Sequence, residues 1–169
     1  MISSDLEGID LEGTGLEGTG LESQVAGWAA DAIIDDAAAV RTVIEAFGDR
    51  LAAADVAGVV SQFTGSAAAM QPSLETVVGS RQLTATYDGA FENMRLDFAF
   101  QFDDITIHVD LAAVRATSHG TITICATGET QPARLRHLFV LERTGAGWKI
   151  AQYMYQRMPE QPGGGCSGI

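Results

Sequence analysis

After residue 30, the spacing of apolar residues changes near residue 94 from that of helices to that of strands, and this change constrains the fold more than any other feature. Before it, apolar residues recur every three or four positions, which is the period of a helix with one buried face. After it they alternate, from Leu96 to Phe102, as they do in a strand. Helices grouped ahead of strands predict an α+β fold, in which three N-terminal helices pack on a strongly bent antiparallel sheet and enclose one pocket.

The helical part divides into three predicted helices. The pair Asp35-Asp36 supplies an N-cap and predicts the start of the first helix there. A short second helix is expected over residues 53–63, with Thr64-Gly65 as its end. Gly79 and Ser80 cap the third helix. Its apolar face consists of Leu83, Tyr87 and Phe91.

The alternating part predicts an antiparallel meander of four strands. The pair Asp103-Asp104 interrupts the alternation of the first strand and indicates a bend or bulge. Residues 144–147 read as a hairpin turn because glycine and threonine are concentrated there. The four predicted strands are residues 96–109, 113–127, 134–143 and 148–157.

Two tails flank the predicted domain. Residues 1–30 contain a repeat of the type Leu-Glu-Gly with a period of five, which fits neither a helix nor a strand. We interpret this segment as a flexible acidic tail; the alternative is that residues 1–24 dock to a protein partner through their repeated units. The folded domain is predicted over residues 31–158, and residues 159–169 form a Gly-rich C-terminal tail.

Composition excludes several classes of function. The formal net charge is −12, and the single lysine and nine arginines form no run, so we expect neither nucleic-acid nor membrane binding. No apolar run is long enough to span a bilayer, and the acidic N-terminus lacks the features of a signal peptide, so the cytoplasm is the expected location. Cys125 is expected to be a buried strand residue and Cys166 an exposed thiol.

Four stretches of the chain together resemble one known superfamily. They are VIEAFGDRLAAADVAGVVSQF (43–63), VGSRQL (78–83) followed by Tyr87 and Phe91, RATSHGT (115–121), and HLFVL (137–141) with GWKIA (147–151). In order and spacing they resemble the nuclear transport factor 2-like superfamily, in its ketosteroid-isomerase-like and SnoaL-like bacterial branch. The resemblance implies a cystatin-like cone with a pocket and, commonly, a homodimer. It implies no single reaction, because members isomerise steroids, cyclise polyketides, hydrate epoxides or only bind.

The same resemblance tests for the catalytic residues of ketosteroid isomerase. That mechanism needs an Asp base, together with a Tyr and a protonated Asp that stabilise the enolate oxygen. The matching positions in this chain are Gln71 for the base, Phe47 for the tyrosine and His137 for the second acid. All three differ in type, so the steroid-isomerase constellation is absent.

Histidine and tyrosine side chains remain as candidates for the pocket. His137 shares a strand face with apolar residues and is the best candidate acid or base, unless it is only a core residue. His119 follows a stripe of threonines that we expect to line the cavity. Tyr87, Tyr153 and Tyr155 offer hydroxyl groups, with packing in the sheet as the alternative.

Three functions remain open. No phosphate loop, dinucleotide fingerprint, nucleophile motif or metal-ligand spacing occurs, so no cofactor is expected. The first hypothesis is a cofactor-free isomerase, cyclase or hydratase acting on a small apolar molecule. The second is a non-catalytic protein that binds such a molecule. The third is an assembly or cargo module in which the N-terminal repeat is the working part.

Overall fold

The computed structural model describes residues 19–159, and it contains three helices and six strands in that part of the chain. The first helix, α1 (Thr19–Ala52), crosses the boundary between two compact units, Met1–Ala32 and Ile33–Ile169. The fold described below is that of the second unit. Most of the predicted repeat tail and the Gly-rich segment with Cys166 lie outside the described residues.

Two shorter helices follow α1 along the chain. The helix α2 (Val56–Ser61) begins after Asp55, whose carboxylate accepts a hydrogen bond of 2.9 Å from the backbone N–H of Gly58. The helix α3 (Gly79–Asn93) opens at a glycine with a positive φ of 80°, a conformation that glycine adopts without strain. Its buried side chains are Leu83, Tyr87 and Phe91, as the apolar spacing predicts.

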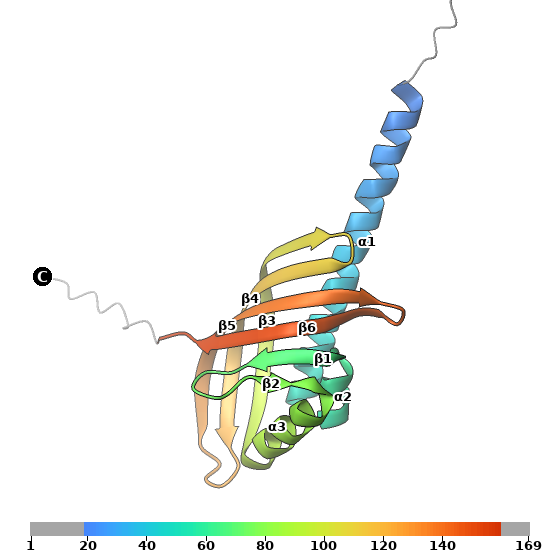
Figure 1. The fold of residues 1–169 in the computed structure, drawn as a ribbon. Coiled ribbons are helices and arrows are strands. Elements are labelled where there is room, and N and C mark those ends of the chain that lie inside the picture. The colour runs from blue at the N-terminus through green and yellow to red at the C-terminus, as the bar shows by residue number, and fades with distance from the viewer. Residues whose placement is uncertain (1–18, 160–169) are drawn as a thin grey trace, which may run out of the picture. The chain divides into compact units, whose positions relative to one another are not determined.

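The six strands form one sheet in the order β2-β1-β6-β5-β4-β3. Neighbouring strands from β3 to β6 run antiparallel, which confirms the predicted meander, whereas β1 pairs with β6 in parallel, so the sheet is mixed. The helices lie against one face of the sheet (Figure 1). The strands are β1 (Phe63–Met70), β2 (Val77–Val78), β3 (Met94–His108), β4 (Leu111–Ile124), β5 (Thr130–Thr144) and β6 (Gly147–Arg157).

Two local features shape the long strands β3 and β4. The register between them shifts between Phe102 and Asp104, which confirms the bulge predicted at the paired aspartates. Farther along, a Cβ at Gly120 would lie 1.8 Å from the carbonyl oxygen of Asp97. Only glycine permits this close approach of the two strands.

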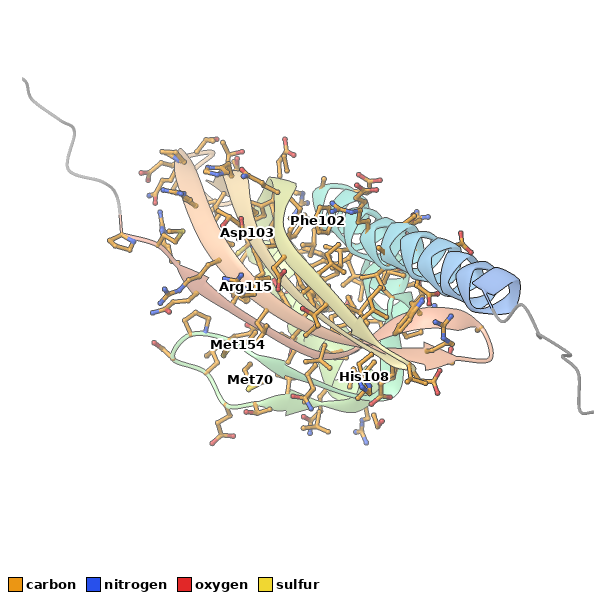
Figure 2. All side chains as sticks on the ribbon, turned by 90° about the horizontal axis from the view of Figure 1, so that it is seen from above. Met70, Phe102, Asp103, His108, Arg115 and Met154 are labelled. Atoms are coloured by element: carbon orange, nitrogen blue, oxygen red, sulfur yellow. The ribbon has the colours of Figure 1, made fainter. Side chains whose placement is uncertain are left out.

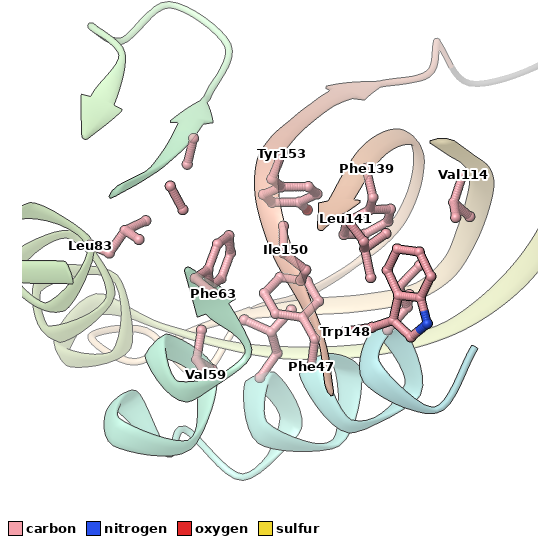
Figure 3. Close-up of a cluster of buried hydrophobic side chains, with 14 of the residues drawn as sticks. Phe47, Val59, Phe63, Leu83, Val114, Phe139, Leu141, Trp148, Ile150 and Tyr153 are labelled. Atoms are coloured by element: carbon pink, nitrogen blue, oxygen red, sulfur yellow. The ribbon is translucent and has the colours of Figure 1, made fainter. Parts of the chain in front are cut away.

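The core lies between α1 and the inner face of the sheet. Val40, Ile44 and Phe47 of α1 are completely buried, at the helical spacing seen in the sequence. Phe47 is central, because its ring centroid lies 5.3 Å from that of Tyr153 and 5.7 Å from that of Phe63 (Figure 3). Aromatic side chains from a helix and two strands therefore meet around one phenylalanine.

The structure corrects four sequence predictions. The predicted start of α1 at Asp35 is wrong, because the Ala-rich segment before it continues the helix back to Thr19. Phe63 does not end the second helix but opens β1, where it pairs with Ile150 of β6. That parallel pairing also corrects the expectation of a purely antiparallel sheet. Cys125 is exposed, because β4 ends one residue before it.

Candidate functional site

A cavity of about 310 Å³ lies between the helices and the inner face of the sheet. Helices α1 and α3 contribute to its walls, as do strands β3, β4, β5 and β6 and the segment after β1. This volume is at the lower end of the range for small-molecule sites, which runs from about 300 to 1,000 Å³. The cavity is therefore suited to a compact molecule.

Most of the cavity wall is apolar. The strand alternation explains this composition, because every second residue of β3 from Met94 to Phe100 points to the same face. The apolar lining residues are Phe47, Leu51, Pro72, Ala90, Met94, Leu96, Phe98, Phe100, Ile122 and Leu135. A molecule enclosed here would gain most of its binding free energy from burial of apolar surface.

Six polar side chains interrupt this apolar wall. They are Gln71, Tyr87, His137, Tyr153, Tyr155 and Arg157. Arg157 and Pro72 are exposed, whereas His137 and Tyr153 are each only 5% exposed. The polar lining thus extends from solvent-exposed residues to buried ones. Among the described residues, no Asp, Glu, Lys or Cys lines the cavity.

His137 is held on both sides of its ring. Its Nε2 lies 2.8 Å from Oγ of Ser118 on β4, and its Nδ1 lies 3.1 Å from the hydroxyl oxygen of Tyr153 on β6. The rings of His137 and Tyr153 are nearly parallel, at 8° and 6.0 Å, and Phe100 lies 4.9 Å from the imidazole. Hydrogen bonds and packing together fix the orientation of the imidazole.

Burial controls the charge of these groups. It lowers the pKa of His137 to about 4, so the imidazole is uncharged at neutral pH. It also raises the pKa of the Tyr153 hydroxyl well above its ordinary value, and that of Tyr87 and Tyr155 in the same direction. The buried end of the cavity therefore holds neutral groups that donate or accept hydrogen bonds. Among the described lining residues, the charged side chain is that of Arg157.

The structure brings six of the seven candidate residues together. Phe47, Gln71, Tyr87, His137, Tyr153 and Tyr155 all line this cavity. His119 does not, because its side chain is exposed and lies on the opposite face of β4 from the buried Ser118. The threonine stripe that includes His119 therefore follows the outer face, in contrast to the expectation that it lines the cavity.

The outer face of the sheet carries a separate set of polar side chains. Arg115 pairs with Asp104 on β3 and with Leu138 on β5, which in turn pairs with Met154 on β6. Asp103, Arg115 and Met154 border a hollow on this face. These three residues are labelled in Figure 2. The two faces thus differ: apart from Arg157 at its exposed end, the cavity is lined by uncharged side chains, whereas exposed charged side chains such as Asp103 and Arg115 lie outside.

Sequence reasoning missed two residues: Ser118, near the buried end of the cavity, and Arg157, at its exposed end. Ser118 occurs in alternation with Val114 and Ala116, so the period of two does place it on the inner face. Its contact with His137 could not be read from the period, because the two residues are on different strands. Arg157 carried no signal beyond its place at the end of the last strand.

The described residues contain no group of three His, Cys, Asp or Glu side chains positioned to hold a metal ion. In that same part of the chain, no helix combines the length and apolar character needed to cross a membrane.

Helices packed on one face of a bent, open sheet around a cavity define a nuclear transport factor 2-like protein with a cystatin-like fold. An NTF2-like protein with a cystatin-like fold from Novosphingobium aromaticivorans superposes with a TM-score of 0.61 at 15% identity, covering 88% of this chain and 94% of that one. A ketosteroid isomerase-like protein from Erwinia carotovora atroseptica superposes with a TM-score of 0.68 at 28% identity, covering 72% and 95%.

The family follows from the sequence match as well. The SnoaL-like domain matches residues 40–156, which is most of the chain, and this protein belongs to that family. A conserved protein from Planctomyces limnophilus shares the fold, with a TM-score of 0.64 at 19% identity, covering 73% of this chain and 98% of that one. No curated protein matches the sequence.

Proposed function

We propose that this protein binds a small, mainly apolar molecule in the cavity and carries out cofactor-free proton chemistry on it, of the isomerase, cyclase or hydratase type. The observation that carries the proposal is the buried pair of His137 and Tyr153, which are 3.1 Å apart and both line an otherwise apolar cavity. A protein that only encloses an apolar ligand does not need two titratable groups in hydrogen-bond contact there.

The chemistry of the pair is that of neutral groups. His137 is uncharged at neutral pH because burial lowers its pKa to about 4, and Tyr153 keeps its proton. The two ring nitrogens of His137 are occupied by Ser118 and Tyr153, so the hydroxyl of Tyr153 is the group of this pair that acts on a substrate oxygen. Its hydrogen bond is strong in a largely apolar site, where little solvent competes for it. Arg157 is the charged group of the described lining and favours a neutral or anionic molecule over a cation.

Family membership supports the choice of reaction class. The similar protein from Erwinia carotovora atroseptica is described as ketosteroid isomerase-like, at 28% identity. In this chain Gln71 lines the cavity at the position that the resemblance assigns to the Asp base. An amide does not take up a proton, so the reaction differs from the steroid-type mechanism in its base.

The second candidate is non-catalytic binding of the same kind of molecule. It is favoured by the absence of any carboxylate in the described lining, since a carboxylate is the usual base for removing a proton from carbon. Homodimer formation and docking through residues 1–24 remain predictions from the sequence.

Proton exchange separates the two candidates. Acetophenone is a small apolar ketone, and exchange of its methyl protons for deuterium in D₂O is followed by NMR with the full-length protein. In the proposed step, Tyr153 donates a hydrogen bond to the carbonyl oxygen, a solvent molecule at the exposed end of the cavity takes up the methyl proton, and the enol returns to the ketone with a deuteron from solvent. The proposal therefore predicts acceleration that is lost in His137→Gln and Tyr153→Phe but kept in His119→Gln, the exposed control. Binding of acetophenone without acceleration favours the second candidate, and neither binding nor acceleration contradicts both.

The place of binding is tested with a matched pair on α3. Ala90 lines the cavity, whereas Ala85 on the same helix is exposed. A phenylalanine at position 90 fills the cavity, so Ala90→Phe is expected to abolish binding of acetophenone in isothermal titration, while Ala85→Phe leaves it unchanged. Equal binding by the two variants would place the ligand elsewhere.

A further inference from the structure

The hydroxyl group of Ser118 forms the inner end of a hydrogen-bonded chain of three side chains. Ser118 is completely buried and lies behind His137 as seen from the cavity, since His137 and Tyr153 line the cavity and Ser118 does not. The contacts are 2.8 Å from Oγ of Ser118 to Nε2 of His137 and 3.1 Å from Nδ1 of His137 to the hydroxyl of Tyr153. Each contact contains one proton, so the chain has two possible directions.

In one direction, the Ser118 hydroxyl donates to Nε2 of His137, the imidazole proton on Nδ1 is donated to the oxygen of Tyr153, and the Tyr153 proton is left over. In the other direction, Tyr153 donates to Nδ1, the imidazole donates from Nε2 to Ser118, and the Ser118 proton is left over. A neutral imidazole permits only these two, because it carries one ring proton.

The surroundings decide between the two directions. Among the described residues, Ser118 has no hydrogen-bond partner besides His137, so a proton left over there would be buried without an acceptor. A buried donor without an acceptor costs free energy that a properly oriented chain avoids. A proton left over on Tyr153 instead lies at the cavity, where a bound molecule accepts it.

We infer that Ser118 is a positioning residue that keeps the proton of His137 on Nδ1, so that Tyr153 directs its own proton into the cavity and selects a molecule with a carbonyl oxygen at its buried end. The ligand part of this inference rests on the proposed function, and the assignment of Ser118 does not. The nearly parallel rings of His137 and Tyr153, 8° apart, keep the chain aligned.

The direction of the chain is measured without any ligand. Long-range ¹H–¹⁵N NMR of the full-length protein at neutral pH reports which ring nitrogen of His137 carries the proton. The expected result is a proton on Nδ1, with an increased population of the Nε2-protonated form in Ser118→Ala and the wild-type state restored in Ser118→Thr, which keeps the hydroxyl. A proton on Nε2 in the wild-type protein would overturn the inference.

The selection of a carbonyl oxygen is measured by isothermal titration with acetophenone and with ethylbenzene, which has the same ring and chain length but no oxygen. The wild-type protein is expected to bind acetophenone about tenfold more tightly, the effect of about one hydrogen bond. This preference should disappear in Tyr153→Phe, decrease in Ser118→Ala and remain in Ser118→Thr.

The outcomes separate the two claims. Equal binding of both compounds by the wild-type protein overturns the selection of a carbonyl oxygen, as does an undiminished preference in Ser118→Ala. If neither compound binds while His137 carries its proton on Nδ1, the proposed function fails and the role of Ser118 stands.

Discussion

Strand β5 passes through two different environments on one face of the sheet. Near its C-terminal end, Leu141 is completely buried and pairs with Ile150 of β6, which is also completely buried. Near its N-terminal end, on the same face, Leu135 is 7% exposed and lines the cavity together with His137. We refer to these regions as the packed end and the cavity end.

The difference lies in what faces the strand, because the alternation of the strand is the same at both ends. Val40 and Ile44 of α1 belong to the same buried cluster as Leu141, and none of the three lines the cavity. At the cavity end, the small side chain of Ala90 on α3 is part of the wall of an unfilled space. One sheet thus combines a close-packed region that provides stability with an unfilled region that is available for binding.

The largest expected effect comes from truncating the same residue type at the two ends. Leu141→Ala should lower the free energy of unfolding by about 4 kcal/mol, because a completely buried leucine leaves an unfilled cavity. Leu135→Ala should cost about 2 kcal/mol, because it only enlarges a space that already exists. Urea denaturation of both variants measures this difference.

Ligand binding should show the reverse order for the same two variants. Leu135→Ala removes part of the cavity wall and should weaken binding of acetophenone, whereas Leu141→Ala should leave it nearly unchanged while the protein remains folded. Circular dichroism checks that both variants are folded at the temperature of titration. Equal losses of stability in the two variants would remove the distinction between the packed end and the cavity end.

The next effect is a dependence of stability on pH that arises at the cavity end. The pKa of His137 is about 4 in the folded protein and close to 6.5 in an unfolded chain. Between these values the unfolded chain binds a proton that the folded protein does not, so stability falls as the pH decreases from 6.5 to 4. From pH 7 to pH 5, this contribution to the free energy of unfolding decreases by about 2 kcal/mol.

Other groups also titrate in this range, so the comparison is made between variants. The difference in stability between wild type and His137→Gln, measured by urea denaturation, should change by this amount from pH 7 to pH 5. His119→Gln, which alters an exposed histidine, serves as the control and should follow the wild-type protein. If the stability of His137→Gln showed the same pH dependence as that of the wild type, His137 would bind a proton equally well in the folded protein and in the unfolded chain, which contradicts the lowered pKa.

The smallest expected effect concerns an ion pair at the packed end. Asp36 of α1 accepts hydrogen bonds from Arg143 and from Nε1 of Trp148, the latter at 3.3 Å, and the bond from Arg143 lowers the pKa of Asp36. The pair is partly exposed, so solvent screens it. Asp36→Asn should therefore cause a small decrease in the urea midpoint at low salt, which becomes smaller at high salt.

The neighbouring residue provides the control for this variant. Asp35 is exposed and precedes Asp36 on the same helix, so Asp35→Asn changes the net charge by the same amount. It should leave the urea midpoint unchanged. A decrease of the same size in both variants would indicate a general effect of charge on the helix.

Local patterns predicted the parts of the fold that depend on neighbours in the sequence. The apolar spacing in α3 and the bulge beside Asp104 both follow from such patterns. The start of α1 was misplaced, because an aspartate that suits an N-cap is also tolerated inside an Ala-rich helix. Phe63 was misplaced because its strand pairs with β6, more than eighty residues later.

The residues of the candidate site also divide into those that the sequence predicted and those that it did not. Six of its residues were named from residue type and apolar spacing or, for Phe47 and Gln71, from the resemblance to the family, and all six line the cavity. The face of β4 was assigned incorrectly for His119, because the alternation of Thr and His looked as suitable for a polar cavity as for an outer surface. The true inner face carries Ser118 among small apolar residues, and small residues give little signal.

The sequence by itself determined the order of elements, the α+β class and the face on which most of the aromatic residues lie, because these depend on periodicity within one segment. Only the tertiary structure decided that Ser118, His137 and Tyr153, from three different strands, form one hydrogen-bonded chain. The register between strands places these groups together, and that register depends on pairing and packing across the whole sheet.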